Sequence, residues 1–302
     1  MKLSAVIAAH DAEPFLGAAI DSALAELPSD SELIVVDDGS TDATPALLER
    51  YRDRVRLLRN PTPTGPGEAR NRGARAASGE LLAFHDADDL VLPERFSALI
   101  EALASHPEVD LVFANGIKCD VDGRPLGPVI PARYVRRLKR RAGPAEMLFD
   151  GFVYPQALCV RRARFLELGG FQRERVEDWE FALRASLRMR LLYVDRPVFA
   201  YRRHPGSMTM QQNAYAHAML AMLERFVAEH PELADVVPAR DIRRARARRF
   251  ARTSKHRLRA GDVAGAAELL SRAVALAPAS LRYRWHLLKL PRASRSPAHP
   301  AS

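Results

Sequence analysis

The segment ELIVVDDGSTDATPALLERY, residues 32–51, contains one complete unit of the expected fold. Its apolar, β-branched start is typical of a buried strand, and two aspartates and a glycine then permit a tight turn. The residues Ser40 to Asp42 are good helix caps, and the spacing of apolar residues up to Tyr51 is helical. The segment therefore predicts a strand, a turn and a helix in that order.

The same order repeats along residues 1–115. Further strands are predicted at residues 3–9, 55–60, 80–85 and 109–115, and further helices at residues 14–26, 67–78 and 93–106. Strands that alternate with helices form a parallel sheet covered on both faces. We therefore expect an α/β fold with a Rossmann-like, mostly parallel sheet flanked by helices, and a ligand crevice beyond the carboxyl ends of the strands.

The regular alternation stops after residue 115. A hairpin is expected to turn at Asp122–Gly123, and helices separated by proline or glycine are expected beyond residue 210. These changes predict a domain at residues 1–210 with halves at 1–115 and 116–210, a helical C-terminal extension at 211–290, and a disordered tail at 291–302.

Composition restricts the class of protein. The chain has 302 residues, of which 47% are hydrophobic, and this is enough for one large domain and an appendage. Two cysteines, Cys119 and Cys159, are too few for a disulfide framework. No run of 18 apolar residues occurs, and His10 and Asp11 interrupt the apolar N-terminus, so a cytoplasmic protein is expected. The net charge of +9 favours acidic partners.

Three aspartates, Asp86, Asp88 and Asp89, follow the strand predicted at residues 80–85. Like charges this close repel one another, so the cluster requires a counter-charge. The spacing Asp86-x-Asp88 supplies oxygen ligands suited to Mg²⁺ or Mn²⁺ that also binds phosphate. As an alternative, the aspartates cap the turn and the helix expected from Pro93, and we assign that role to Asp89.

Capping does not account for the acidic pair Asp37 and Asp38. A carboxylate at a strand end can accept hydrogen bonds from a nucleobase or from ribose hydroxyls, as in dinucleotide-binding folds. A nicotinamide-dependent oxidoreductase is nevertheless excluded, because the segment AAHDAEPF, residues 8–15, lacks the glycines of the G-x-G-x-x-G motif.

Five ordered motifs over about residues 3–210 resemble family 2 glycosyltransferases with the GT-A fold. They are SAVIAAHDAEPFLGAAIDSAL, ELIVVDDGSTD, GPGEARNRGARAASGELLAFHDADDLVLPERF, GGFQRERVEDWEFALR and YRRHPGSMT. The resemblance implies a hexosyltransferase-like enzyme of polysaccharide or glycoconjugate biosynthesis. It would transfer a sugar from a nucleotide-diphosphate donor to an acceptor hydroxyl with inversion, using divalent Mg²⁺ or Mn²⁺.

The resemblance also implies roles on the donor side, in residues 1–115 and beyond. Asp38 would pair with the donor base, and Asp86 and Asp88 would bind the metal, Asp86 also facing the nucleotide sugar. The other nucleotide-sugar candidates are Ala8, His10, Asp11, Arg70, Asn71 and His204. The family usually has proline and tyrosine where this chain has Ala8 and His10. Solvent-exposed or capping roles for His10, and an ordinary loop position for His204, stay open as alternatives.

On the acceptor side, in residues 116–210, the resemblance implies that Asp178 is the catalytic base. Inversion needs one carboxylate to remove the proton of the attacking hydroxyl. Glu177 and Trp179 would lie near the acceptor, which would be a glycan or a lipid-linked sugar. The alternatives are that both acids only favour the start of a helix, and that Trp179 belongs to the core.

Ten Lys or Arg residues and one acid lie within residues 240–259. A solvated helix surface, adsorption on an anionic membrane at the inner face of the plasma membrane, and nucleic-acid binding are the possible explanations. Aromatic residues for stacking are nearly absent there, so no nucleic-acid partner is expected. The alternative to an enzyme is a catalytically weak nucleotide-binding scaffold that recruits partners through its helical tail.

Overall fold

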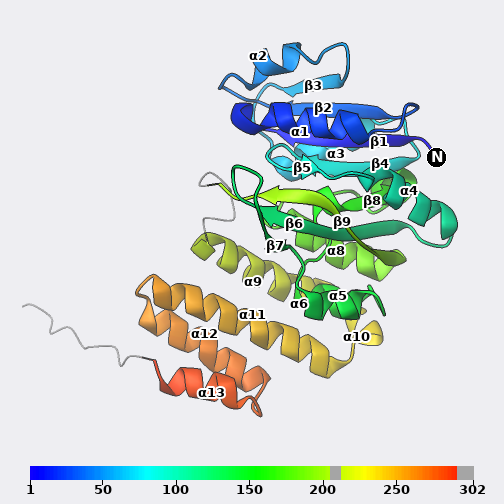
Figure 1. Cartoon of the computed structure of the whole chain (residues 1–302). Coiled ribbons are helices and arrows are strands. Elements are labelled where there is room, and N and C mark those ends of the chain that lie inside the picture. The colour runs from blue at the N-terminus through cyan, green and yellow to red at the C-terminus, as the bar shows by residue number, and fades with distance from the viewer. Residues whose placement is uncertain (205–211, 291–302) are drawn as a thin grey trace, which may run out of the picture. The chain divides into compact units, whose positions relative to one another are not determined.

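The computed structural model describes residues 1–204 and 212–290, and the chain divides into two compact units, Met1–Ser207 and Met208–Ser302 (Figure 1). The first unit contains a nine-stranded mixed sheet in the order β3-β2-β1-β4-β8-β6-β9-β5, with β7 paired to β6. The strands are β1 (Leu3–Ala9), β2 (Glu32–Asp38), β3 (Arg56–Asn60), β4 (Leu81–Asp86), β5 (Leu90–Val91), β6 (Leu111–Cys119), β7 (Pro125–Pro128), β8 (Leu158–Arg161) and β9 (Leu191–Arg202).

The sheet is parallel where the sequence predicted it to be. Strand β1 pairs in parallel with β2 and with β4, and β2 pairs in parallel with β3. Strand β8 differs, because it lies antiparallel between β4 and β6. The expected mostly parallel α/β sheet is therefore confirmed, and β8 is inserted between two strands that the alternation made neighbours.

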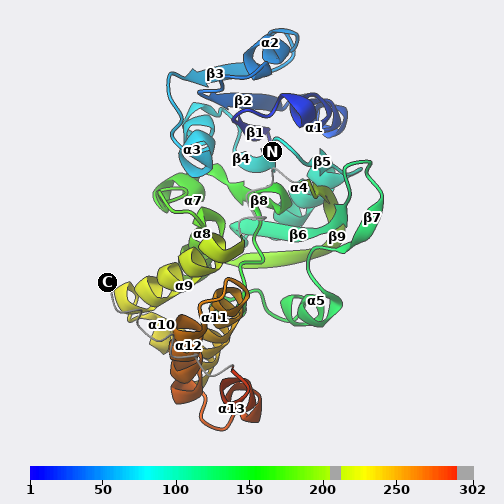
Figure 2. The same ribbon diagram turned by 90° about the vertical axis from the view of Figure 1, so that its left-hand side faces the viewer.

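Helices cover both faces of the sheet (Figure 2). The helices of this unit are α1 (Glu13–Glu26), α2 (Thr44–Glu49), α3 (Pro66–Ala76), α4 (Arg95–Ser105), α5 (Ala132–Leu138), α6 (Pro144–Phe149), α7 (Arg162–Glu167) and α8 (Glu177–Arg188). Leu3 and Ile7 of β1 share one buried cluster with residues of α1 and α4. On the other face α3 approaches closely, because a Cβ at Gly73 would lie 2.3 Å from Val6 Cγ1.

An aromatic cluster fixes α8 against the sheet. Phe84 of β4 contacts Phe165 of α7 and Phe171, and Phe181 of α8 contacts both of these rings, with centroid separations of 4.9–5.4 Å. Buried aromatic pairs contribute about 0.5–1.5 kcal/mol each beyond their area. This cluster therefore holds the first turn of α8 near the carboxyl end of β4.

The hairpin expected at Asp122–Gly123 is present between β6 and β7. Gly123 has a φ of 83°, a conformation that favours glycine. The Asp120 carboxylate accepts hydrogen bonds from the main-chain N–H groups of Asp122 and Arg124. The strands pair antiparallel from Ile117 onward.

The second unit is helical. It contains α9 (Gln212–Glu229), α10 (Leu233–Val236), α11 (Ala239–Arg259), α12 (Val263–Leu276) and α13 (Leu281–Leu288). Leu220, Phe250, Ala251, Leu270 and Ala273 form its core. Among residues 1–204 and 212–290, no helix combines the length and the apolar character needed to cross a bilayer.

Candidate active site

The acidic loops meet at the carboxyl edge of the sheet. Strands β1, β2 and β4 run parallel and end at Ala9, Asp38 and Asp86. Ala8 lies in register with Asp86 on one side, and Ala9 lies in register with Asp37 on the other. The loops that follow these strands therefore leave the sheet at one edge.

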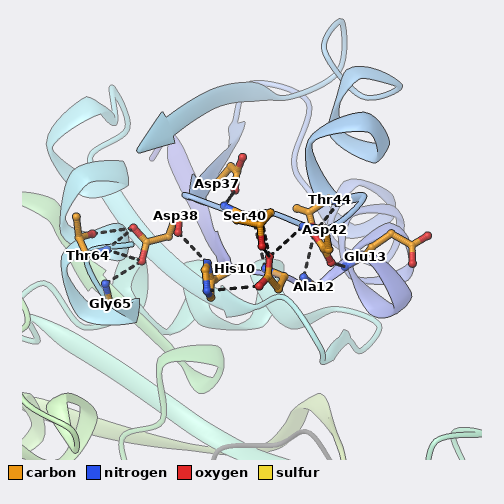
Figure 3. Close-up of polar contacts among 12 residues, drawn as sticks. His10, Ala12, Glu13, Asp37, Asp38, Ser40, Asp42, Thr44, Thr64 and Gly65 are labelled. Carbon is orange, nitrogen blue, oxygen red and sulfur yellow. Dashed lines mark hydrogen bonds and ion pairs between the residues drawn. The ribbon is translucent and has the colours of Figure 1, made fainter. Parts of the chain in front are cut away.

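The loop after β1 is fastened to the loop after β2 (Figure 3). His10 Nδ1 lies 2.9 Å from the Asp38 carbonyl oxygen, and the Asp11 carboxylate accepts the Thr41 N–H at 2.7 Å. The Thr41 N–H holds the pKa of Asp11 below its ordinary value. Because the side chains of His10 and Asp11 are 45% and 42% exposed, both remain on the rim of the site.

The expected helix caps act mainly on a different helix. Ser40 Oγ accepts the Asp11 N–H, Thr44 Oγ1 accepts the Ala12 N–H, and Asp42 Oδ2 accepts the Glu13 N–H at the start of α1 (Figure 3). Asp42 also accepts the Thr44 N–H at the start of α2, but the N-cap residue of that helix makes no side-chain hydrogen bond. The capping residues after β2 therefore position α1 as well as α2.

The Asp38 carboxylate is engaged by the chain itself. It accepts hydrogen bonds from the Thr64 N–H and hydroxyl and from the Gly65 N–H at 2.8 Å (Figure 3). Asn60 Nδ2 donates a further hydrogen bond at 2.5 Å. Burial raises the pKa of Asp38, but these donors outweigh burial and hold it below its ordinary value. Asp38 thus fastens the segment before α3 to the end of β2.

The aspartates after β4 form a compact cluster. One carboxylate oxygen from each of Asp86, Asp88 and Asp89 lies within 4.8 Å of the other two. Asp89 is fully buried and accepts the Arg202 N–H and Gln156 Nε2, both at 2.9 Å. The assignment of Asp89 as a cap of the next helix was wrong, because α4 begins at Arg95 after Glu94 and has no side-chain cap.

Asp88 has a partner far along the chain. His204 Nε2 lies 3.0 Å from Asp88 Oδ2, and the His204 ring packs on Phe15 at a centroid distance of 4.4 Å. Burial and then the charge of Asp86 raise the pKa of Asp88 above its ordinary value. The repulsion expected from the sequence is therefore present at this carboxylate.

A buried guanidinium joins this cluster to α8. Arg70 of α3 donates to Asp86 Oδ1 at 2.6 Å and to Glu177 Oε1 at 2.8 Å. Burial lowers the pKa of Arg70, but Asp86 and Glu177 raise it above its ordinary value, so the guanidinium stays charged. Arg70 is thus the counter-charge between acids that are far apart in the sequence.

Asn71, the other donor-side candidate of α3, binds main chain. Its amide donates to the Phe171 carbonyl at 2.8 Å and accepts the Phe171 N–H at 2.9 Å. Both ends of the amide therefore hold the turn that precedes α8. This arrangement favours a positioning role over a direct contact with a ligand.

Asp178 stands beside the Arg70 bridge at the start of α8. Its carboxylate accepts the Trp179 N–H at 2.8 Å. Burial, and then the neighbouring Glu177 charge, raise the pKa of Asp178 to about 7. A carboxylate with this pKa can both accept and release a proton near neutral pH.

Trp179 lies in the core and presents no face to a sugar. The residue is 1% exposed, and its indole Nε1 donates to the Met147 carbonyl at 2.7 Å. A Cβ at Gly151 would lie 2.7 Å from the ring. These contacts favour the alternative stated above, in which Trp179 packs in the interior.

Three contacts that shape the site were not predicted from the sequence. They involve Asn60 and Thr64 at Asp38, and Gln156 at Asp89. Asparagine and threonine next to a proline-rich turn are common in surface loops, so the local sequence does not indicate that these two residues bind Asp38. Gln156 becomes a partner only because β8 lies beside β4.

Known proteins resemble this chain over most of its length. The family model "Glycosyl transferase family 2" matches residues 4–169. The putative glycosyltransferase EpsH of Bacillus subtilis is 28% identical over 236 residues, which are 74% of this chain and 67% of EpsH. The succinoglycan biosynthesis protein ExoO of Rhizobium meliloti is 38% identical over 54% of this chain, and the match spans only about half, 48%, of ExoO.

Two solved structures share the fold. S. aureus TarS, residues 1–349 in complex with UDP-GlcNAc, has a TM-score of 0.66 at 19% identity, over 91% of this chain and 84% of that one. The mannosyltransferase PcManGT from Pyrobaculum calidifontis, in complex with GDP-Man and Mn²⁺, has a TM-score of 0.63 at 20% identity, over 95% and 83%. At these identities the likeness concerns the fold.

Proposed function

Because the chain belongs to glycosyl transferase family 2, we propose that it transfers a sugar from a nucleotide-diphosphate donor to an acceptor hydroxyl, with inversion and with a divalent metal. The observation that carries this proposal is the bridge from Asp86 through Arg70 to Glu177. It supports placing the acids after β4 and the carboxylate of Asp178 in one site.

The acids after β4 suit a hard divalent cation. Asp86 uses one oxygen for Arg70 and Asp88 uses one for His204, so each carboxylate keeps a second oxygen for a ligand bond. Burial and then the charge of Asp86 raise the pKa of Asp88, and a bound cation would stabilise the charged form of this carboxylate. Bound Mg²⁺ or Mn²⁺ would neutralise charge on the departing diphosphate. Asp86 and Asp88 are the proposed ligands.

Asp178 is the proposed general base. In an inverting transfer this carboxylate removes the proton of the acceptor hydroxyl as that oxygen attacks the anomeric carbon. Arg70 holds Glu177, the residue before Asp178, and so orients the first turn of α8. Asn71 fixes the turn before α8 through the Phe171 main chain. The base is thereby held on a rigid element.

Arg202 is proposed to contact the diphosphate. Its guanidinium lies over the Phe15 ring at 5.1 Å, and the residue is 7% exposed. Within the described ranges 1–204 and 212–290, its buried Nε has no hydrogen-bond partner. A buried guanidinium with an unpaired N–H group favours an anionic ligand. His204, whose ring also packs on Phe15, would approach the same ligand.

The donor base is proposed to lie along the rim formed by Ala8, His10 and Asp11. Asp38 would contribute its carboxylate only by exchanging a hydrogen bond from Thr64 or Gly65 for one from the base. Since ExoO is named a succinoglycan biosynthesis protein, we place the reaction in polysaccharide or glycoconjugate synthesis. The acceptor would be a glycan or a lipid-linked sugar.

The pH dependence of turnover tests the base. With saturating donor and Mn²⁺, kcat is expected to rise about tenfold per pH unit below pH 7 and to level off above it, because protonated Asp178 cannot accept a proton and its pKa is about 7. Glu177→Gln removes a negative neighbour and should move the rising limb to lower pH. A profile that is flat from pH 5.5 to 7 contradicts the assignment.

Donor binding tests the function as a whole. A thermal-shift screen of UDP, GDP, ADP, CDP and dTDP, with and without Mn²⁺, is expected to raise Tm for one base and only with the metal. Arg202→Met should reduce this shift but leave the shift from the matching nucleoside unchanged. If no nucleotide raises Tm, the proposed transfer from a nucleotide-diphosphate donor is contradicted.

A further inference from the structure

The positive charge of this protein belongs to its C-terminal unit. Residues 208–302 contain 17 Lys or Arg and 7 Asp or Glu, whereas residues 1–207 contain 29 and 30. The net charges are therefore +10 and −1. No acidic residue follows Glu268. Long-range attraction to an anionic surface is consequently a property of the helical unit alone.

Helix α13 exposes an apolar face. Leu281, Trp285 and Leu288 are 78%, 52% and 85% exposed, and their spacing of four and three residues places them on one side of the helix. On the opposite side Tyr283 and Leu287 pack against the core of this unit. The helix is therefore anchored, and its exposed face is a fixed feature of the surface.

Basic side chains lie beside this face on α13. Lys289 Nζ lies 4.3 Å from the centroid of the Trp285 ring. Burial and then the charges of Lys255 and Arg282 hold the pKa of His286 below its ordinary value, which places a lysine of α11 close to α13. Helix α11 also carries exposed cations, at Arg244, Arg252 and Arg259. Apolar and cationic groups are thus combined in one helical unit.

We propose that α13, through Leu281, Trp285 and Leu288, inserts into the headgroup region of an anionic lipid bilayer, with the cations of α11 and α13 binding lipid phosphates. Tryptophan and leucine on one helix face with lysine and arginine beside them are the features of interfacial helices. The exposed apolar side chains of α13 distinguish this surface from a basic helix that is only solvated.

The charge around the exposed face of α13 favours an anionic lipid bilayer over a second copy of the chain as its binding partner. A symmetric dimer formed through the same face would bring Arg282 and Lys289 close to the same cations of the second copy, and like charges would repel. Anionic lipid headgroups would instead neutralise them. The proposal stands on the second unit alone, so it does not depend on the reaction proposed above.

Co-sedimentation of the full chain with vesicles tests this proposal. Binding to vesicles of 70% phosphatidylcholine and 30% phosphatidylglycerol is expected to exceed binding to pure phosphatidylcholine at least tenfold. Leu281→Gln with Leu288→Gln should reduce binding at least tenfold and leave Tm unchanged. The matched control is Leu126→Gln in β7, an apolar residue that is 55% exposed in the other unit and should bind as the wild type does.

Fluorescence provides a second readout, because the chain has two tryptophans and Trp179 is buried. Vesicles should shift the emission of Trp285 to shorter wavelength, and Trp285→Phe should abolish the shift. Equal binding to both vesicle types, or equal loss in the Leu126→Gln control, would overturn the proposal. So would a lipid-free dimer that Leu281→Gln with Leu288→Gln converts to monomer.

Discussion

Asp178→Asn is expected to lower kcat by about three orders of magnitude and to change the Kd of the nucleotide-diphosphate donor by less than about threefold. Asparagine keeps the shape of the side chain, and its Oδ1 can still accept the Trp179 N–H. The start of α8 therefore stays in place, and only the ability to take a proton is lost. Single-turnover kinetics with saturating donor would measure the chemical step, and calorimetry would measure donor binding.

Glu180→Gln is the matched control for this experiment. Glu180 lies two residues further along α8, is 6% exposed, and pairs with Arg184 rather than with the site. Its replacement should lower Tm, because a buried ion pair is lost. It should leave kcat within a few fold of the wild type, because that ion pair lies away from the reacting groups. If Asp178→Asn retains more than a third of wild-type turnover, another group is the base.

Asp88→Ala is expected to abolish Mn²⁺-dependent donor binding and to lower turnover at least a thousandfold. The variant removes one of the two proposed metal ligands and leaves His204 without its carboxylate partner. Mn²⁺ binding can be followed by electron paramagnetic resonance, independently of activity. In the thermal-shift screen the variant should give the same small response with and without Mn²⁺.

Asp89→Asn separates metal binding from folding in the same loop. Both Asp89 oxygens accept hydrogen bonds from the chain, and an amide can replace only one of them. Losing one of these hydrogen bonds should destabilise the fold by about 1–3 kcal/mol, which would be visible as a lower Tm. The affinity for Mn²⁺ should fall much less than in Asp88→Ala. Equal loss of Mn²⁺ affinity in both variants would contradict the assignment of ligands.

Local pattern was enough to predict most elements of the first unit. The strands predicted at residues 3–9 and 32–38 are β1 (Leu3–Ala9) and β2 (Glu32–Asp38). Buried apolar runs and the turns after them are local properties, so the chain itself marks them. The start of α4 was placed two residues too early, at Pro93, because proline and aspartate are usual at helix starts.

The position of β8 was not predictable in this way. Its apolar run has the same period in a parallel and in an antiparallel strand, so the pattern carries no direction. Only the folded sheet inserts β8 between β4 and β6. That insertion brings Gln156 to Asp89 and removes this aspartate from the helix cap that the sequence favoured.

The α/β class, the family resemblance and the carboxylates after β1, β2 and β4 were all predictable from the sequence, because they depend on residues adjacent in the chain. The counter-charge that each carboxylate receives depends instead on how the chain packs. Arg70 pairs with Asp86 and with Glu177, the latter 107 residues away, and Asp88 pairs with His204 across 116 residues. A buried charge is stabilised by whichever opposite charge the packing brings within hydrogen-bonding distance, and sequence spacing does not encode that distance.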